Sequence, residues 1–475
     1  MMLYCPSGWK RNKKRIESGK HCNHAVITSW VRASRDKSIA YARGMPLRWW
    51  AMKRRLSRLY TTGMFFRKHI GPGVITGASD DDPSGIATYA QAGAKFGYGM
   101  LWMALFTFPL MAVIQEISGR IGRVTGKAIA ANLRLHYPRW LLYLCVGLLL
   151  TANTINIGAD LGAMGEAMEL LFNIPSALSV VAFAAVCVYL AVFLPYKTYV
   201  PILQWLVVAL FAYVFTAFVT DVPWKDVVRF TFVPSLHLNK ETLAMIIAVL
   251  GTTISPYLFF WQSSQEVEEI RAHRFLHALI RFPRDADREL WKLRVDTVVG
   301  MAFSNLIAFF IILTTAATLN AKGITAIETA ADAAEALRPL ARSAASFLFA
   351  AGIIGTGLLA VPVLAASAAF GVGEAMHWPV GLERNVVKAK GFYGVLTAAT
   401  VMGLFLNFFG INPIDALLAA AVVNGIVSVP LMAMLVHMSA NGKVMGSLRI
   451  PRKLYIAGWT TTAIVALAGV GFFLT

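Results

Sequence analysis

The sequence predicts an all-α membrane protein with about eleven transmembrane helices. Its 475 residues would suit two or three soluble domains, but 57% of them are hydrophobic and the mean hydropathy is +0.60. Apolar runs of about 20 residues, the length that crosses a bilayer, recur along the chain. Two of these runs contain a proline beside polar residues, so two helices are expected to be discontinuous.

The apolar runs define the expected spans to within a few residues at each end. These spans form one transmembrane domain at 66–475, which follows a basic extension at 1–65. In chain order the spans are 69–92, 98–118, 139–163, 175–195, 199–220, 242–265, 295–318, 343–371, 391–409, 414–437 and 454–474.

The charge distribution orients these spans. Residues 1–68 contain 17 Lys or Arg against two acidic residues, which gives +15 of the total net charge of +19. The loops after the second, eighth and tenth spans are also basic, so the positive-inside rule makes them cytoplasmic. The N-terminus is then cytoplasmic and, with an odd number of spans, the C-terminus lies outside.

The extension at 1–65 has no apolar core long enough for a signal peptide. Residues 46–60 combine Trp and Leu with basic side chains, a composition suited to an amphipathic helix on an anionic membrane surface. An overextended reading frame is an equal interpretation, because Met45, Met52 and Met64 offer later starts. Nucleic-acid binding by the tail is disfavoured in a chain with so many spans.

The first span contains residues 77–85, Gly-Ala-Ser-Asp-Asp-Asp-Pro-Ser-Gly, with carboxylates at Asp80, Asp81 and Asp82. Each ionised carboxylate at mid-membrane depth costs roughly 2.5–3.5 kcal/mol on insertion scales, so this group indicates a functional site. Pro83 removes a backbone donor, so the helix should unwind here, and unwound backbone at that depth must line protein or a polar cavity. The alternative is that the aspartates lie at the aqueous end of a helix.

The third span carries Asn153, Asn156 and Asp160 at helical spacing. Two roles stay open for them, interhelical hydrogen bonding and the lining of a pathway. In the ninth and tenth spans, Asn407 is expected to pack between helices and Asn424 to face the pathway.

The sixth span contains the second break, at residues 251–257, where Pro256 interrupts the run Gly-Thr-Thr-Ile-Ser-Pro-Tyr. A single proline kink would be a structural feature only. Paired breaks in the first and sixth spans are instead what an inverted repeat of five plus five helices places face to face. The first repeat is then expected at about 66–220, the second at about 240–437, and an extra helix at about 454–474.

The run at residues 71–94 resembles the first helix of the Nramp family of divalent-metal transporters. The similarity extends through Gln115 and the glycine-rich residues 122–126 and resumes at residues 251–256. It covers nearly the whole chain after residue 65. The resemblance implies a LeuT-like inverted repeat and the transport of divalent metal ions.

The resemblance also implies a set of metal ligands. The family's Asp-Pro-Gly-Asn motif reads Asp-Pro-Ser-Gly here, so the aspartate is kept as Asp82, whereas Gly85 can offer only a backbone carbonyl. In the sixth helix the family's ligand methionine corresponds to Ser255, and the helix carbonyl would come from Thr252.

Further residues are implied to line the pathway. The family's two histidines in the sixth helix correspond to Tyr257 and Gln262, and one of the two acidic residues of its third helix corresponds to Asp160. We expect Asp80 and Asp81 to attract cations or to share protons, because crowded carboxylates cannot all ionise cheaply.

The departures from the family motifs bear on which ion is carried. A thioether is a soft ligand suited to transition metals, whereas hydroxyl, carbonyl and carboxylate oxygens suit Mg²⁺, Ca²⁺ or Mn²⁺. Serine in place of methionine also widens the site, which favours Mg²⁺ because this ion usually keeps several waters. The pattern is similar to the Nramp-related magnesium transporter branch.

We therefore expect a secondary transporter that imports Mg²⁺ or Mn²⁺ by alternating access. The alternative is a proton-coupled Mn²⁺/Fe²⁺ transporter of the ordinary family type. A Na⁺-coupled organic-solute symporter is disfavoured because no cradle for a substrate carboxylate is visible. An intramembrane aspartyl protease using Asp82 and Asp160 is disfavoured because a cation site explains more residues.

The expected location is the plasma membrane, which is the inner membrane in a bacterium. The expected partners are the divalent cation, as substrate, and the lipid bilayer. No enzymatic activity, cofactor or nucleic-acid partner is expected. The sequence leaves the oligomeric state open, and a monomer is the simplest expectation.

Overall fold

The computed structural model describes residues 72–194, 208–235, 239–273 and 276–474, and these are helical, without a β-strand. The first half of the chain forms α4 (Pro72–Ala78), α5 (Pro83–Phe96), α6 (Leu101–Thr125), α7 (Ile129–His136), α8 (Arg139–Phe172), α9 (Ser176–Phe193), α11 (Phe211–Val219) and α12 (Trp224–Phe232). The second half forms α13 (Lys240–Thr253), α14 (Pro256–Ala272), α15 (Ala286–Thr318), α16 (Ala330–Glu335), α17 (Arg338–Ala341), α18 (Ala345–Ala375), α19 (Lys390–Leu406), α20 (Pro413–Ala440), α21 (Gly442–Met445) and α22 (Arg452–Leu474). The extension at 1–65 and the candidate amphipathic segment in it lie outside the described residues.

Within this part of the chain, nine helical stretches are long and apolar enough to cross a membrane. One of them, Pro83–Thr125, contains both α5 and α6, which the apolar runs predict as two spans. The fifth predicted span is described only from residue 208, where the shorter apolar stretch Val208–Val219 lies. These findings confirm an all-helical membrane fold.

Two helices are longer than their apolar runs predict. The third span was expected to end at residue 163, but α8 continues to Phe172, and the seventh was expected to begin at 295, but α15 begins at Ala286. In both cases the extra turns carry charged side chains. The backbone hydrogen bonds of an α-helix continue past the apolar core, because charged side chains at its ends can be solvated while those bonds stay intact.

The first discontinuous helix is divided into α4 and α5 at residues 79–82. Asp82 has an extended backbone (φ −75°, ψ 169°), and its side chain accepts a hydrogen bond from the backbone N–H of Gly85. Pro83 occupies the first helical position, where its missing N–H has no intrahelical partner to lose. An N-cap aspartate followed by proline starts a new helix, so the chain restarts here as α5.

The second discontinuous helix is divided into α13 and α14. Helix α13 ends at Thr253, and Ser255 is extended (φ −73°, ψ 138°) before Pro256 begins α14. Proline disfavours a helical conformation in the residue before it, which explains the position of the break. Both discontinuities that the sequence predicts are therefore present.

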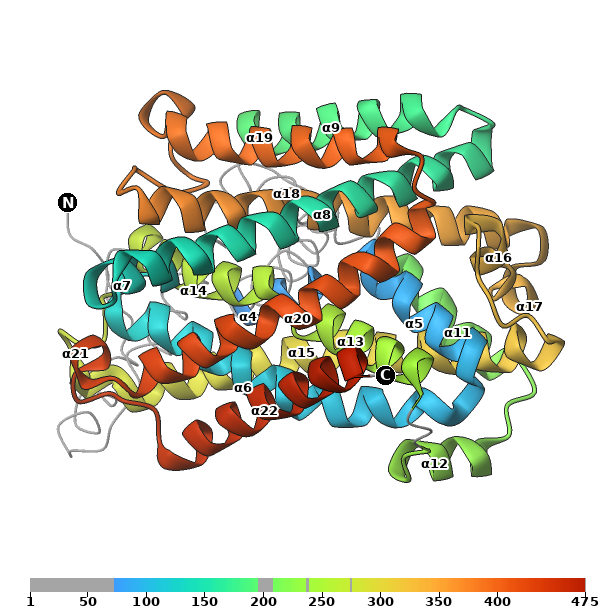
Figure 1. Cartoon of the computed structure of the whole chain (residues 1–475), viewed down its shortest axis with the longest axis horizontal. Coiled ribbons are helices and arrows are strands. Elements are labelled where there is room, and N and C mark those ends of the chain that lie inside the picture. The colour runs from blue at the N-terminus through green and yellow to red at the C-terminus, as the bar shows by residue number, and fades with distance from the viewer. Residues whose placement is uncertain (1–71, 195–207, 236–238, 274–275, 475) are drawn as a thin grey trace, which may run out of the picture. The chain divides into compact units, whose positions relative to one another are not determined.

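The sixth helix lies at the centre of the bundle. In the most apolar window of Lys240–Ala272, 94% of the residues are buried, against 28% in the corresponding window of Arg452–Leu474. Helix α13 packs extensively against α20, and α4 against α15. Figure 1 shows α9 and α19 side by side on one side of the described helices, with α22 on the opposite side.

Glycines allow the two broken helices to pack closely on their neighbours. A Cβ atom on Gly77 would collide with the backbone of Gly300 in α15. A Cβ atom on Gly251 would collide with the backbone of Ala421 and Gly425 in α20. Small residues are the usual means of close helix approach in membranes, and here they fix the inner ends of both broken helices.

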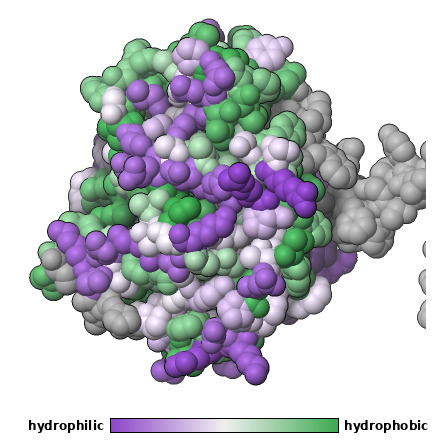
Figure 2. All heavy atoms as spheres, turned by 90° about the vertical axis from the view of Figure 1, so that its right-hand side faces the viewer, coloured by the Kyte–Doolittle hydropathy of each residue, from purple (hydrophilic) through white to green (hydrophobic). Residues whose placement is uncertain are grey.

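The short helices mark the two ends of the bundle. Figure 1 shows α7 and α21 at one end and α16 and α17 at the other. Figure 2 views the α16 and α17 end, where hydrophilic residues gather among hydrophobic ones. The apolar lengths of the helices run between these two ends (Figure 1), as in a membrane-spanning bundle.

Candidate functional site

Two tyrosines join the two breaks. The hydroxyl of Tyr257 in α14 donates to the carbonyl of Ser79 at 2.8 Å. The hydroxyl of Tyr89 in α5 lies 3.1 Å from Oγ1 of Thr253 in α13. Both rings are buried, at 1% and 2% exposure. The unwound segments of the first and sixth helices therefore share one buried region, as the inverted repeat predicts.

Asp82 lies inside this region, with only 3% of its surface exposed. Its Oδ1 accepts from the backbone N–H of Gly85 at 2.7 Å, and its Oδ2 accepts from Nδ2 of Asn156 in α8 at 2.9 Å. A buried carboxylate at a helix N-terminus is stabilised by such amides and can still coordinate a cation. The alternative, that the aspartates lie at an aqueous helix end, is wrong.

Asn156 connects Asp82 to a second polar residue. Nδ2 of Asn424 in α20 donates to Oδ1 of Asn156 at 3.2 Å. These hydrogen bonds link three helices in the order Asn424, Asn156, Asp82. Because Oδ1 of Asn156 accepts from Asn424, its Nδ2 is the atom that faces the carboxylate. Asn424 was predicted to face the pathway, but Asn156 was not assigned to the site, although its helical spacing with Asp160 carried that signal.

Asp80 and Asp81 are also buried, at 1% exposure each. Oγ of Ser304 in α15 lies 2.5 Å from Oδ2 of Asp80 and 3.0 Å from Oδ1 of Asp81. The remaining oxygens, Oδ1 of Asp80 and Oδ2 of Asp81, are buried without a hydrogen bond. Ser304 is not among the site residues predicted from the sequence, because nothing in the apolar seventh span distinguishes it.

Asp160 lies on α8 and is fully buried. It interacts electrostatically with Asp82 and with the backbone amide of Ser84, but neither of its carboxylate oxygens makes a hydrogen bond of good geometry. Asp160 is therefore beside the first break, where the motif comparison expected it, with its hydrogen-bonding capacity unused.

Ser255 uses its hydroxyl locally. Its Oγ lies 2.7 Å from the carbonyl oxygens of both Gly251 and Thr252. The hydroxyl proton is thus directed at carbonyls that the end of α13 leaves without helical partners. The lone pairs of Ser255 and the second lone pair of the Thr252 carbonyl remain as oxygen donors at the break.

Gly85 leaves space beside Asp82. A Cβ atom at this position would lie 3.4 Å from Oδ1 of Asp82 and 3.4 Å from Cε2 of Tyr89, which is ordinary van der Waals contact. A Cβ atom at residue 85 would therefore fit beside the Asp82 carboxylate without a clash. In this chain the position provides room instead of a ligand side chain.

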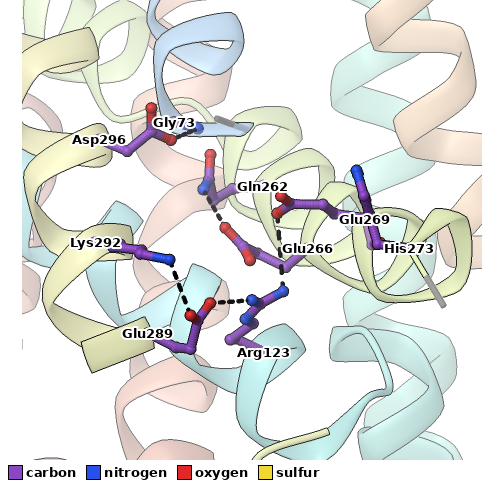
Figure 3. Close-up of polar contacts among 9 residues, drawn as sticks. All are labelled: Gly73, Arg123, Gln262, Glu266, Glu269, His273, Glu289, Lys292 and Asp296. Carbon is purple, nitrogen blue, oxygen red and sulfur yellow. Dashed lines mark hydrogen bonds and ion pairs between the residues drawn. The ribbon is translucent and has the colours of Figure 1, made fainter. Parts of the chain in front are cut away.

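Gln262 lies on α14 beyond the break and links it to α4. Its Oε1 accepts from the hydroxyl of Thr76, and its Nε2 donates to Oε1 of Glu266 at 3.4 Å. Figure 3 shows Gln262, Glu266, Glu269 and His273 following one another along α14. The stripe leads away from the break.

Charged residues surround the far end of this stripe, and we call them the ion-pair cluster. Arg123 of α6 forms ion pairs with Glu289 of α15 and, at 3.8 Å, with Glu269 of α14 (Figure 3). Lys292 adds a second cation to Glu289 at 3.0 Å. Asp296 accepts from the backbone N–H of Gly73 at 2.6 Å, which caps the start of α4. The cluster thus connects α4, α6, α14 and α15.

The first break has no such cations. In the described part of the chain, no ion pair involves the four carboxylates at positions 80, 81, 82 and 160. Nor do three His, Cys, Asp or Glu side chains among the described residues converge as ligands for one metal ion. A cation held here would therefore be coordinated by carboxylates together with amide, hydroxyl and backbone oxygens.

Asn407 has the packing role expected of it, and Glu116 and Asn153 also connect helices outside the site. Glu116 in α6 pairs with Arg120 at 2.8 Å and with Arg294 of α15 at 3.0 Å. Nδ2 of Asn407 donates to the carbonyl of Gly158 at 2.9 Å, and Nδ2 of Asn153 donates to the carbonyl of Leu364. These contacts connect helices and leave the residues outside the site.

Comparison with sequence families gives a match over most of the chain. A family model described as Nramp, natural resistance-associated macrophage protein-like, matches residues 73–475. A protein named divalent metal cation transporter MntH from Klebsiella pneumoniae (strain 342) is 27% identical over 414 residues, which cover 83% of this chain and 91% of that protein. A second MntH, from Klebsiella pneumoniae subsp. pneumoniae, has the same identity and coverage.

Solved structures share the fold. A crystal structure of the Eremococcus coleocola manganese transporter superposes with a TM-score of 0.70 and 16% identity, covering 85% of each chain. Mhp1, a nucleobase-cation-symport-1 family transporter, superposes with a TM-score of 0.53 and 14% identity, covering 85% of this chain and 91% of the other. At these identities the likeness concerns the fold, and it confirms the LeuT-like arrangement with discontinuous first and sixth helices.

Proposed function

The chain belongs to the Nramp family, and from this premise we propose that it is an integral membrane transporter that carries divalent metal cations by alternating access. The metal ion is its substrate, and the protein is a transporter with no enzymatic role. The relatives named as divalent metal cation transporters support this function over most of the chain. Two assays in proteoliposomes, metal-isotope flux and peptide cleavage, distinguish this transporter from a protease that uses Asp82 and Asp160.

One observation carries the assignment of the site. Asp82 is a buried carboxylate at a helix break, held by amides and without a cationic partner in the described residues. We assign the carboxylate of Asp82, the backbone carbonyls of Gly85 and Thr252, and the oxygen of Ser255 as the metal ligands. Asp80, Asp81, Asp160, Tyr257, Gln262 and Asn424 are assigned to the pathway beside it.

The proposed set of oxygen donors is best suited to a hard metal ion. Carboxylate, carbonyl and hydroxyl oxygens favour Mg²⁺ or Mn²⁺ over late transition metals. Glycine at position 85 is also smaller than the family's asparagine, which favours an ion that retains water. We therefore assign Mg²⁺, Mn²⁺ or both as the physiological substrate. The competing function is proton-coupled Mn²⁺ or Fe²⁺ uptake, which the family resemblance implies.

Orientation and domain limits complete the proposal. The loops at the α7 and α21 end are basic, which supports a cytoplasmic location for that end, and we infer that the N-terminus is cytoplasmic. We also propose that transport is inward. A basic extension at 1–65 then precedes a transporter domain at 66–475 in the plasma membrane, the inner membrane of a bacterium. The first repeat ends with α11, the second with α20, and α22 is the extra helix.

The deciding experiment is uptake by the purified full chain in proteoliposomes, with Mg²⁺, Mn²⁺, Fe²⁺ and Cd²⁺ offered in turn. We expect saturable uptake of Mn²⁺ that millimolar Mg²⁺ inhibits. A protein that carries Mn²⁺ while excluding millimolar Mg²⁺ has the ordinary family function. Absence of flux for every divalent cation would refute the transport proposal.

A further inference from the structure

The first break gathers more carboxyl groups than one divalent cation neutralises. Asp80, Asp81, Asp82 and Asp160 are each at most 3% exposed, and no ion pair in the described residues involves them. A buried carboxylate without a partner is costly, so it acquires either a cation or a proton. The proposed transport site accounts for one divalent ion and thus for two of the four charges.

The four carboxylates divide into two pairs that face different helices. Asp82 bonds to Asn156 and interacts with Asp160, both on α8. Asp80 and Asp81 instead meet at Ser304 on α15. The hydroxyl of Ser304 lies within hydrogen-bond distance of one oxygen of each carboxylate. Asp80, Asp81 and Ser304 therefore form a unit beside the Asp82 site.

Each member of this unit keeps an oxygen that is sealed from water and makes no hydrogen bond, Oδ1 in Asp80 and Oδ2 in Asp81. Two buried carboxylates elsewhere in the described chain, Glu374 and Glu116, keep no oxygen of this kind. Glu374 accepts the backbone N–H of Ala131, and Glu116 pairs with Arg120 and Arg294. Unsatisfied buried polar atoms are few in native proteins, and a missing ion is one of the usual reasons for them.

We propose that Asp80, Asp81 and Ser304 form a second binding site for a hard divalent cation, beside the transport site at Asp82. Two carboxylates neutralise one such ion, and the free carboxylate oxygens with the serine hydroxyl are the donors that Mg²⁺ and Mn²⁺ prefer. Fully occupied, the break then holds two divalent cations against four carboxylates. This inference rests on the proposed transport function and adds a second ion to the same region.

The test counts bound ions. The purified full chain is titrated with Mn²⁺ alone, and free Mn²⁺ is followed by electron paramagnetic resonance. We expect two ions per chain in the wild type, and one ion in the Asp80→Asn/Asp81→Asn variant, which keeps the shape of both side chains. Asp82→Asn should also bind one ion. Glu374→Gln, which neutralises a buried carboxylate outside the region, should bind two.

Ser304→Ala tests the same site without changing its charge, and it also serves if the double variant does not fold. Loss of this hydroxyl ligand should weaken binding of the second ion by at least about tenfold, the low end even for an outer partner of a metal site. A wild type that saturates at one ion, or a second ion that persists in the double variant or is unaffected in Ser304→Ala, overturns the proposal. Flux by a wild type that binds one ion would refute the second site alone, whereas absence of flux would refute the transport function.

Discussion

Carboxylates gather at two places along the broken helices, and the chain supplies cations to only one of them. In the ion-pair cluster, Arg123 and Lys292 serve Glu269 and Glu289, while Asp296 caps the backbone of α4. At the first break, the aspartates receive hydrogen bonds from amides and a hydroxyl and no ion pair from the described residues.

This difference separates carboxylates that hold helices together from those suited to a mobile cation. A paired charge has a fixed partner, so removing that partner leaves an uncompensated charge and lowers stability. An unpaired carboxylate inside a membrane protein is retained only where an ion or proton can compensate it. The two regions should therefore respond to substitution in different measurements, flux for the break and unfolding for the cluster.

The largest effect is expected at Asp82. Asp82→Ala removes the charge that a divalent cation requires, so uptake should fall by at least about tenfold, the low end of what even an outer partner of a metal ligand contributes. The variant should still fold, because removing this carboxylate leaves no buried cation without a partner. Radioactive Mn²⁺ uptake in proteoliposomes measures the loss, and size-exclusion elution monitors folding. Unchanged uptake would contradict the site assignment.

The opposite response is expected at Arg123. Arg123→Ala leaves Glu289 with Lys292 alone and removes the cation beside Glu269, which should lower the free energy of unfolding by about 1.5 kcal/mol, the low end for a hydrogen bond to a charged group. Uptake per folded molecule should stay near the wild-type value. Thermal unfolding in detergent together with normalised flux tests this. A stable variant with abolished flux would show that the cluster belongs to the transport machinery.

Selectivity should shift at the positions where this chain lacks the family's ligands. Ser255→Met adds a soft donor, and Gly85→Asn adds an amide in space that accepts a Cβ atom. Together they should move the preference from Mg²⁺ towards Mn²⁺ or Cd²⁺ by about tenfold, equal to about 1.4 kcal/mol. Competition of Mg²⁺ against Mn²⁺ uptake measures this preference.

Ser255→Ala is the matched control for the selectivity change. It removes the hydroxyl that contacts the carbonyls of Gly251 and Thr252 without adding sulfur. If Ser255→Ala and Ser255→Met have the same preference, the residue serves helix packing alone.

The smallest effect is expected for the co-transport of protons with the metal ion. Tyr257 and Gln262 stand where the family resemblance places histidines, and neither side chain titrates near neutral pH. Metal uptake should therefore acidify the vesicle lumen little or not at all, as followed with an entrapped pH-sensitive dye. Acidification that depends on the metal and disappears in Asp82→Ala would reveal another proton route, with Asp160 and Glu266 as the buried carboxyl groups to test.

The sequence by itself determined the parts of this protein that depend on local chemistry. Pro83 and Pro256 each lie among polar residues that can form a helix end, so both breaks were predictable. Proline alone does not decide this, because Pro109, Pro362 and Pro430 lie inside continuous helices. Carboxylates in an apolar span are rare enough to indicate a site, which identified Asp82 before any contact was known. Apolar length alone likewise predicted the membrane-spanning fold.

Only the tertiary structure decided which residues share a site. Ser304 meets Asp80 across 224 positions of sequence, and Asn424 meets Asn156 across 268. Such pairs depend on how each helix is rotated and packed, and in a membrane that rotation is set by small residues such as Gly77 and Gly251, because an apolar face packs equally well on lipid. Hydrophobic periodicity therefore fixes no contact here, and a serine or asparagine acquires its role only through the helix it faces.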